Sequence, residues 1–283
     1  MKKLVVYITV MLVGAVASIN KPDVYDPEIM ITFQPAIWNT TKSAYTQVYP
    51  SDVPFKVWAY ASSILIDGQE VSCTDGQWTI AKDYYWPSSP QTTDFYAWSP
   101  SYASAGFSLD EGISFNDFDV HEDSDFLYAR PVKGALKPLV ETPVSLIFET
   151  PLCEIEFYVY ASAEDNVTIW ITGIELQEMY TTGNFCLLPS ENWSGLGDPS
   201  DTTVFNGKLE LSAKPQIVGK MTRVIPQHIR PVVHFMYMMD GSEAVIKRTE
   251  VLDMADAPIP AIGKKREYIL KISQDCVTVQ NPK

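Results

Sequence analysis

Apolar residues alternate with polar residues along much of this chain, so that every second side chain shares one face. The alternation is clearest in these groups: Ile29, Ile31 and Phe33; Val144, Leu146 and Phe148; Cys153, Ile155, Phe157 and Val159; and Tyr268, Leu270 and Ile272. A period of two residues is typical of strands that bury one face of an antiparallel sheet. No window carries an apolar stripe at helical spacing over several turns, so the pattern predicts an all-β protein.

One segment changes its apolar face part-way along. Its apolar residues fall into two sets of opposite parity: Val167, Ile169 and Ile171, then Ile174 and Leu176. Gly173 lies at the change, and an extra residue in a strand reverses the direction of the side chains that follow. The sequence therefore predicts a β-bulge at Gly173 that brings both sets to the same side.

Residues 83–100 concentrate aromatic side chains on either side of a turn rich in proline and serine. The rings belong to Tyr84, Tyr85, Trp86, Phe95, Tyr96 and Trp98. Each buried ring removes about 150–250 Å² from water, whereas exposing all of them would leave a larger apolar patch than soluble monomers usually carry. We expect most of these rings in the core, with Tyr85 and Trp86 at the turn as candidate exposed aromatic contacts.

A proline-rich segment near the middle of the chain interrupts the alternation. The segment 130–143 reads RPVKGALKPLVETP and lacks a regular apolar face. Such a stretch predicts a domain boundary, which we place within ten residues of Leu139, and a long crossover between strands is the alternative. After a leader over 1–17, we therefore expect one domain over 18–139 and a second over 140–283.

The first residues have the features of a secretory signal peptide. Two lysines precede an apolar run over 4–13, and residues 15–17 supply the small-x-small pattern of a cleavage site. We expect cleavage between Ala17 and Ser18 and export of the remainder. Residues 16–20 are similar to a bacterial lipoprotein box, but Ile19 occupies the position of the cysteine that would carry the lipid, so this chain cannot be lipidated there.

The charge of the chain limits its partners. The formal net charge is −14, and removal of residues 1–17, which hold two lysines and no acid, lowers it to −16. Such a surface repels phosphate backbones and anionic lipid headgroups. We therefore expect no nucleic-acid partner and no binding to an anionic membrane face.

No motif in the sequence points to catalysis, a cofactor or a metal. G-x-S-x-G, P-loop, H-E-x-x-H and dinucleotide patterns are absent. The cysteines are too scattered for a zinc site, and both free thiols and disulfides remain open. The acidic stretch 110–125 lacks the spacing of a calcium-binding loop. We expect no catalytic, cofactor-binding or metal-binding residue, and no enzyme.

The order of several short segments resembles a known family. These segments are FKVWAYA (55–61), YYWP (84–87), DFYAWSP (94–100), DFLYAR (125–130), VSLIFETPLCEIEFYV (144–159), VTIWITGIEL (167–176), VIPQ (224–227) and KKREYILKI (264–272). Together they resemble the fimbrillin-like (Mfa-like) family of exported Bacteroidetes proteins, the subunits of type V pili. The chain departs from the family pattern at 149–151 and at Ile19.

The resemblance implies a fold and a mode of assembly. It implies two tandem transthyretin-like antiparallel β-sandwich domains. It also implies N-terminal trimming by an Arg/Lys-specific protease, which frees a groove that a strand of the next subunit fills. Lys21 and Lys42 are the basic residues that flank the first predicted strand, 29–34. A cut after Lys42 would release this strand and a cut after Lys21 would not, so Lys42 is the predicted trimming site.

These observations predict an exported fimbrial or adhesin subunit at the outer membrane or cell surface. Its partners would be other fimbrial subunits, bound by strand addition, and it would perform no chemistry. The alternative is a surface β-sandwich module that binds host or bacterial glycans or glycoproteins through the aromatic residues near Tyr85 and Trp86. The C-terminal segment 275–283 would be either a donor strand or a frayed end.

Overall fold

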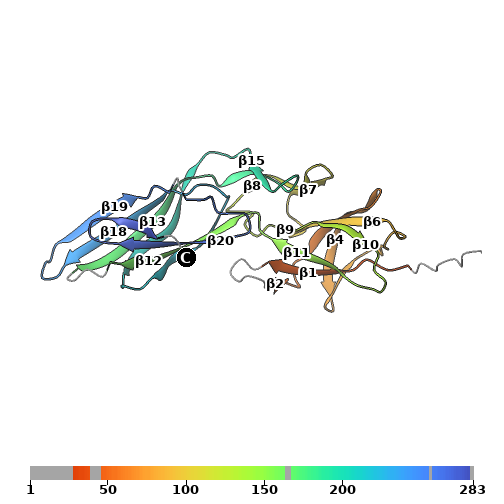
Figure 1. Cartoon of the computed structure of the whole chain (residues 1–283), viewed down its shortest axis with the longest axis horizontal. Helices are drawn as coiled ribbons and strands as arrows, with labels where there is room; N and C mark the ends of the chain where they lie inside the picture. Colours follow the sequence, from red (N-terminus) through yellow and green to blue (C-terminus); the bar gives the residue numbers. More distant parts are fainter. Residues whose placement is uncertain (1–27, 39–45, 163–166, 255–256, 281–283) are drawn as a thin grey trace, which may run out of the picture.

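The computed structural model describes residues 28–38, 46–162, 167–254 and 257–280. The described chain is built from strands, turns and extended segments and contains no helix, which confirms the all-β prediction. Consequently, nothing in these ranges forms a helix that could cross a membrane. The molecule is elongated, with one group of strands at each end and a small sheet between them (Figure 1).

The N-terminal sheet has nine strands. They are β1 (Phe33–Trp38), β2 (Thr46–Val48), β3 (Phe55–Tyr60), β4 (Ile64–Thr74), β5 (Gln77–Ile80), β6 (Thr92–Ser99), β9 (Leu127–Ala129), β10 (Val132–Leu136) and β11 (Val144–Glu149). The order is β10-β6-β3-β4-β5-β1-β11-β9, and β2 pairs with β1. Because β9 also pairs with β6, the sheet closes on itself around an apolar interior.

The C-terminal half contains two sheets of four strands each. One has the order β17 (Gln216–Val224), β12 (Cys153–Ala161), β20 (Lys265–Ile272) and β21 (Val277–Gln280). The other has the order β16 (Ser200–Glu210), β13 (Val167–Met179), β18 (Pro231–Met239) and β19 (Val245–Val251). Their inward faces form one apolar cluster, so the two sheets make a sandwich.

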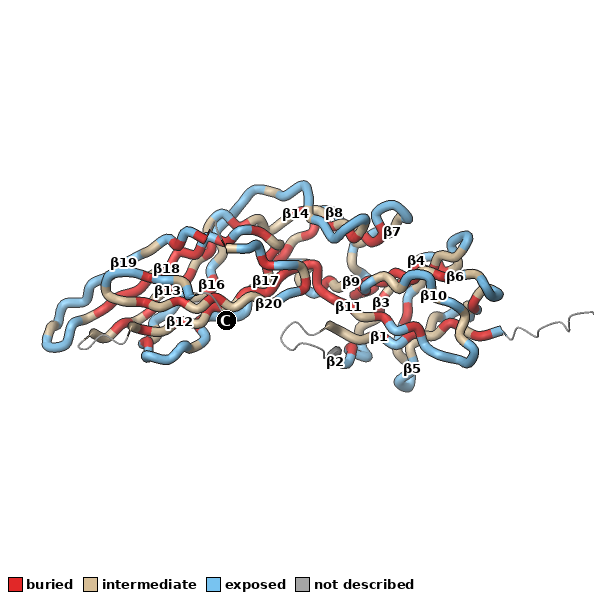
Figure 2. The backbone as a smooth tube through the Cα atoms, viewed as in Figure 1, coloured by how far each residue is buried: buried red, intermediate tan, exposed pale blue. Residues whose placement is uncertain are grey.

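The small sheet joins strands from both halves of the sequence. Its order is β15 (Asn192–Ser194), β14 (Thr182–Cys186), β8 (Gly112–Asp119) and β7 (Ala105–Ser108). It covers the outer face of β3 and β6, where a third apolar cluster forms around Trp58, Trp98 and Phe118. Figure 2 shows buried backbone in all three regions.

The predicted alternations are observed, but the first strand, expected over 29–34, forms as β1 over Phe33–Trp38, and before it only Met30 makes an isolated bridge, to Tyr85. Cys153, Ile155, Phe157 and Val159 on β12 are fully buried, and the register of β13 against both neighbouring strands shifts between Ile171 and Gly173. This shift confirms the predicted bulge. Most strand pairs are antiparallel, as expected, and two are parallel, namely β1 with β11 and β12 with β20. Parallel neighbours need long connections, and each of these pairs joins strands far apart in the chain.

The strand β11 lies beyond the boundary expected at Leu139. It pairs with β1 and β9 of the N-terminal sheet, and its inward residues Val144, Leu146 and Phe148 belong to the N-terminal apolar cluster. The next buried strand, β12, belongs to the C-terminal sandwich. The proline-rich segment thus contains β10, which pairs with β6, followed by the crossover from β10 to β11 within the N-terminal sheet. Division of the chain into two domains stays a prediction, and the cores place its boundary after β11.

Candidate functional site

β1 runs through the middle of the N-terminal sheet. On one side it pairs in parallel with β11, from Phe33 opposite Val144 to Ile37 opposite Phe148. On the other side it pairs with β2 and meets β5 only where Phe33 lies opposite Trp78. Removal of β1 would therefore leave a gap one strand wide, with open backbone groups along its sides.

The inward face of β1 and of the residues before it is apolar. Ile29, Ile31 and Phe33 are all buried, as the alternation predicted. The Phe33 ring meets the rings of Phe55 and Phe95 edge to face, with centroids 6.2 and 6.3 Å apart. Full burial of one such side chain is worth about 1.5–3 kcal/mol. A gap left by β1 would consequently be an apolar groove that favours refilling by another apolar strand.

Backbone hydrogen bonds hold some residues of the segment from Ile29 to the end of β1 and leave a gap at Pro35. Ile31 N–H donates to the Tyr84 carbonyl oxygen over 2.7 Å, and Trp86 N–H donates to the Ile29 carbonyl oxygen over 3.0 Å. Pro35, in the middle of β1, has no N–H and donates nothing. Proline is disfavoured in central strands for this reason. β1 is therefore held more by its side chains than by a complete hydrogen-bond ladder.

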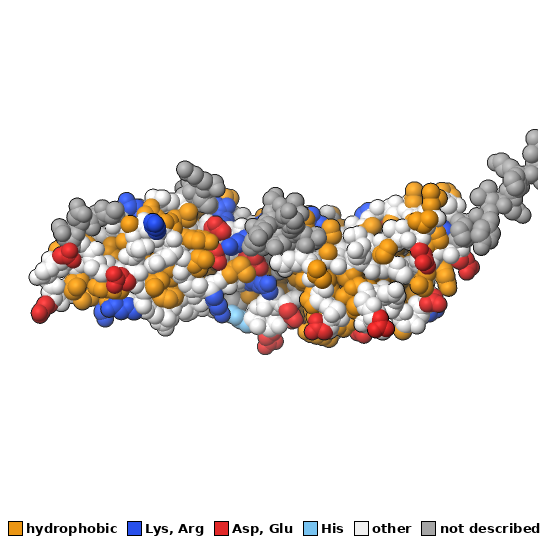
Figure 3. Space-filling model, turned by 90° about the horizontal axis from the view of Figure 1, so that it is seen from below, with side chains coloured by type: hydrophobic (Ala, Val, Ile, Leu, Met, Phe, Trp, Pro, Cys, Tyr) orange, Lys and Arg blue, Asp and Glu red, His pale blue; other side chains and the backbone are white. Residues whose placement is uncertain are grey.

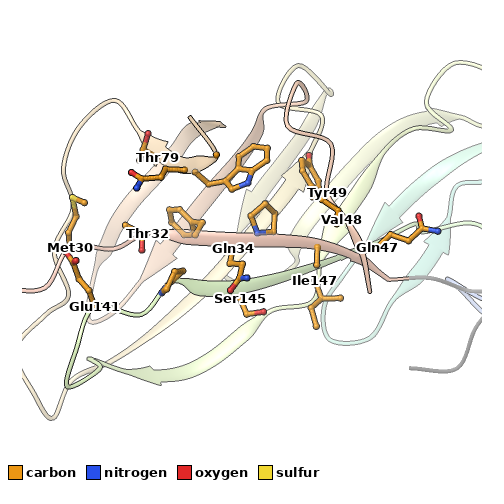
Figure 4. A pocket seen from close by; sticks show the side chains of 17 residues that line it. Met30, Thr32, Gln34, Gln47, Val48, Tyr49, Thr79, Glu141, Ser145 and Ile147 are labelled. Atoms are coloured by element: carbon orange, nitrogen blue, oxygen red, sulfur yellow. The ribbon is translucent and has the colours of Figure 1, made fainter. Parts of the chain in front are cut away.

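A groove of about 930 Å³ follows the outer side of β1 (Figure 4). Polar side chains supply much of its lining: Thr32, Gln34, Gln47, Gln77, Thr79 and Ser145. Val48 on β2 also lines it and is 92% exposed. One side of β1 thus packs into the core, while the other remains open to solvent.

β1 ends at Trp38, which lies between two cations. The Arg130 guanidinium is 5.1 Å from the ring centroid, and the Lys264 ammonium is 5.5 Å from it. Arg130 directly follows β9, whereas Lys264 directly precedes β20 in the C-terminal sandwich. A cation–π contact is worth about 0.5–1 kcal/mol at an exposed site. Trp38 therefore connects β1 to both ends of the molecule.

A buried carboxylate lies where β11 ends. The Glu149 side chain is 5% exposed, and Arg130 donates to its two oxygens over 2.8 and 2.7 Å. The Tyr128 hydroxyl lies 3.2 Å from Glu149 and 2.9 Å from Glu191. Burial raises the pKa of Tyr128 well above its ordinary value, so this hydroxyl stays protonated and can donate. The network ties β9 to the end of β11.

The last strand, β21, lies at an edge of the C-terminal sandwich. Among the described strands it pairs with β20 alone, from Ile269 opposite Gln280 to Ile272 opposite Val277. Val277 is buried and Val279 packs against the same core, whereas Thr278 and Gln280 alternate with them. The segment 277–280 is therefore an ordered strand with the same two-residue alternation as the strands in the core.

Comparison with known proteins identifies the family. The model of the fimbrillin-like family matches residues 41–283, which is most of the chain. The chain belongs to the fimbrillin-like family. This membership supports a role as a fimbrial subunit or adhesin, a structural rather than enzymatic protein that associates with other fimbrial components. A search of the curated proteins gives no match.

Solved structures share the fold of this fimbrillin-like protein. A fimbrial protein from Bacteroides vulgatus is 13% identical with a TM-score of 0.58, and the match covers 89% of this chain and 98% of that one. A protein from Bacteroides uniformis assigned to cell adhesion is 14% identical with a TM-score of 0.54, covering 89% and 95%. One from Bacteroides ovatus, also assigned to cell adhesion, is 13% identical with a TM-score of 0.54, covering 91% and 97%.

The sequence-predicted processing sites lie outside the described residues. These are the cleavage residues Ala17 and Ser18, the lipobox position Ile19, and Lys42. Lys42 falls between Trp38, the last residue of β1, and Thr46, the first of β2. The signal peptide and the trimming site stay predictions.

The two aromatic contacts predicted at the turn differ in exposure. Tyr85 is 42% exposed, as expected, but the expectation for Trp86 is wrong. Trp86 is 7% exposed, and its ring packs edge to face on Phe95 with centroids 5.4 Å apart. The backbone bond from Trp86 to Ile29 turns this residue inward, and a partner so distant in sequence gave no local signal. A single exposed ring does not form a stacking platform.

Sequence reasoning missed the residues that link β1 to its surroundings. Arg130, Glu149 and Lys264 approach Trp38 or each other only because β9, β11 and β20 end in the same region. The local sequence could have suggested that Glu149 is buried, because this residue directly follows an apolar run. Within the described ranges, no three His, Cys, Asp or Glu side chains are placed to hold a metal ion.

The four cysteines are free, and their environments predict different reactivity. Cys153 is buried, which raises the pKa of its thiol to about 12, whereas Cys276 is exposed. Because the thiolate is the reactive form, we expect a thiol reagent at pH 8 to label Cys276 rapidly and Cys153 only after denaturation. Mass spectrometry of labelled peptides, with Cys276→Ser as the control, measures this. Rapid labelling of Cys153 in the folded protein would contradict the buried position of β12.

Proposed function

We propose that this protein is an exported fimbrial subunit that assembles at the cell surface by strand exchange after cleavage on the C-terminal side of Lys42. Family membership supports the fimbrial role. The observation that carries the mechanism is the position of β1, a proline-containing strand in the middle of a sheet whose inward side chains are buried. Loss of residues up to Lys42 would remove the whole of β1 and retain β2 in the chain, and it would free β2 from β1, its one partner strand among the described residues.

The donor in this proposal is the C-terminal segment of a second copy. β21 has Val277 and Val279 on one face, a spacing that matches the apolar alternation of the segment it would replace. An edge strand with one bonded neighbour is more readily exchanged than a central strand. Backbone hydrogen bonds supply most of the affinity in strand addition, and alternate side chains supply the specificity.

The test uses the protein 18–283, treated with a limiting amount of Lys/Arg-specific protease and run unheated on a denaturing gel. We expect a ladder of oligomers that boiling removes, composed of chains beginning at Ser43. Burial of the two valine side chains of β21 at each joint, at about 1.5–3 kcal/mol each, together with the backbone hydrogen bonds of strand addition, makes such oligomers stable without heat.

Two variants serve as controls. Lys42→Gln should still be cut after Lys21 but retain β1, so it should remain a monomer. Deletion of 275–283 removes β21 and should leave the trimmed protein unable to form the ladder. A protein cut after Lys42 that stays monomeric at high concentration would disprove the strand-exchange mechanism, while membership of the family would stand.

A further inference from the structure

A cleft of about 550 Å³ opens where the C-terminal sandwich meets the small sheet. Its walls come from β16 and β17, the edge strands of the two sandwich sheets, and from the turns at 120–124 and 179–181. None of the β1 residues lines it. A volume of this size is within the usual range of small-ligand sites, about 300–1,000 Å³.

The close approach of β16 and β17 depends on Gly219. Its φ is +79°, in the left-handed region, and a Cβ at this position would lie 2.6 Å from the Val204 carbonyl oxygen. Glycine alone avoids both the strain and the collision. The neighbouring residue Lys220 is thereby placed on the wall of the cleft.

The cleft gathers cationic groups on a protein that is strongly acidic overall. Lys220 and Arg223 line it beside His121 and the carboxylate of Asp201, and the turn 120–124 that forms one wall also carries Glu122 and Asp123. The Lys220 side chain is exposed, and its ammonium pairs with no other side chain in the described part of the protein. Seen from below, Lys, Arg and His side chains occur near the middle of the molecule, with Asp and Glu side chains beside them (Figure 3). A carboxylate entering this cleft would meet cations on a surface that elsewhere repels it.

The polar groups of the cleft are held in place by their own partners. Arg223 donates to Glu154 over 3.3 Å and to the Ser124 carbonyl oxygen over 2.8 Å. The buried Gln227 side chain bonds both the N–H and the carbonyl oxygen of Tyr180, each over 2.9 Å. Such groups need little reorganisation when a ligand binds, which lowers the entropic cost of binding.

The remaining lining suits a sugar ring. Hydroxyl groups come from Ser124, Thr181, Thr202, Thr203 and Thr222, and the half-buried Tyr180 and exposed Met221 add apolar surface. Asp201 accepts a hydrogen bond from Glu178 N–H over 3.1 Å through one oxygen. Its second oxygen can accept a bond from a sugar hydroxyl. Few convergent polar groups beside apolar surface are typical of small-molecule sites.

We propose that this cleft binds a short acidic saccharide, with Lys220 and Arg223 facing its carboxylate and the hydroxyl groups and Asp201 facing the ring. The site is separate from β1, so the proposal does not depend on strand exchange. The carboxylate could belong to a sialic acid or to a uronic acid, since both present the same charged group on a pyranose ring.

The test measures binding to the untrimmed protein 18–283 by calorimetry or ligand-observed NMR. The probes are 3′-sialyllactose, a glucuronic-acid disaccharide, and lactose as the neutral match. We expect at least one acidic probe to bind roughly tenfold or more tightly than lactose, because a charge-assisted contact contributes most of the difference. The acidic probe that binds more tightly identifies which kind of sugar supplies the carboxylate.

Lys220→Glu should weaken binding of the acidic probe roughly tenfold or more, because it reverses the charge that faces the carboxylate. Lys214→Glu is the matched control, since this exposed lysine makes the same charge change outside the cleft. Equal losses in the two variants would show a general field effect and overturn the site. Absence of saturable binding of either acidic probe up to about 10 mM, or equal binding of lactose, would overturn it as well.

Discussion

Replacement of Phe148 by alanine is expected to destabilise the N-terminal part of the protein by about 3–5 kcal/mol and to leave the C-terminal sandwich unchanged. Phe148 is fully buried, and its ring lies 5.2 Å from that of Phe55 and 5.0 Å from that of Tyr49, centroid to centroid. Its removal leaves a cavity lined by rings that cannot close together, because β3 and β11 are fixed in the same sheet.

Phe157 is the matched control, only nine positions further along the chain. It is equally buried, but it stacks on Tyr268 in the C-terminal sandwich, with ring centroids 5.5 Å apart. Phe157→Ala should lower the free energy of unfolding of the C-terminal sandwich by a similar amount. Calorimetry measures both variants, and tryptophan fluorescence adds a probe weighted toward the N-terminal part, which holds Trp38, Trp58, Trp78, Trp86 and Trp98. If both variants lower one shared transition equally, the two parts unfold as a unit and the division into domains fails.

Replacement of Arg130 by methionine is expected to lower the free energy of unfolding by about 2–3 kcal/mol. Breaking a buried ion pair by removing one partner usually costs about 3–5 kcal/mol, and the half-exposed guanidinium reduces this value. The cost arises because Glu149 would keep its charge in a buried position with only Tyr128 as a described partner. Methionine retains most of the apolar length of the side chain, so the loss reports mainly on the charge.

Arg230→Met provides the comparison. Arg230 pairs with Glu178 over 3.3 Å, but both side chains are at least half exposed, so its loss should cost below about 1 kcal/mol. Urea unfolding of both variants measures the difference. A second substitution, Glu149→Gln in the Arg130→Met background, should recover part of the stability because it removes the buried charge. Equal small effects at Arg130 and Arg230 would show that the carboxylate of Glu149 is well solvated.

Local alternation was enough to predict the strands with the clearest apolar faces, because a half-buried strand requires one apolar face whatever its partners are. The groups on β11, β12 and β20 were all found buried in the predicted orientation, and the bulge at Gly173 follows from the same rule. The order of short segments was enough to predict the family, which the match over residues 41–283 shows.

The proline-rich segment shows where local reasoning ended. Its composition indicates an interruption of regular structure. A linker between domains and a crossover between strands have the same composition, so the sequence does not distinguish them. Pairing of β11 with β1, more than a hundred positions earlier in the chain, decides for the crossover. Parallel pairing over such a distance leaves no trace in local sequence.

The sequence by itself determined the all-β class, the buried faces of the clearly alternating strands, the acidic charge and the family of this protein, since each depends on neighbouring residues or on composition. Only the tertiary structure decided which strands meet. It showed that both faces of β6 are buried, with Phe95 in the N-terminal core and Trp98 stacked on Trp58, centroids 4.0 Å apart, beneath the small sheet. It also joined Arg130, Glu149, Trp38 and Lys264 at the end of β1. These contacts arise from long-range strand pairing, and no local pattern encodes the partner of a strand.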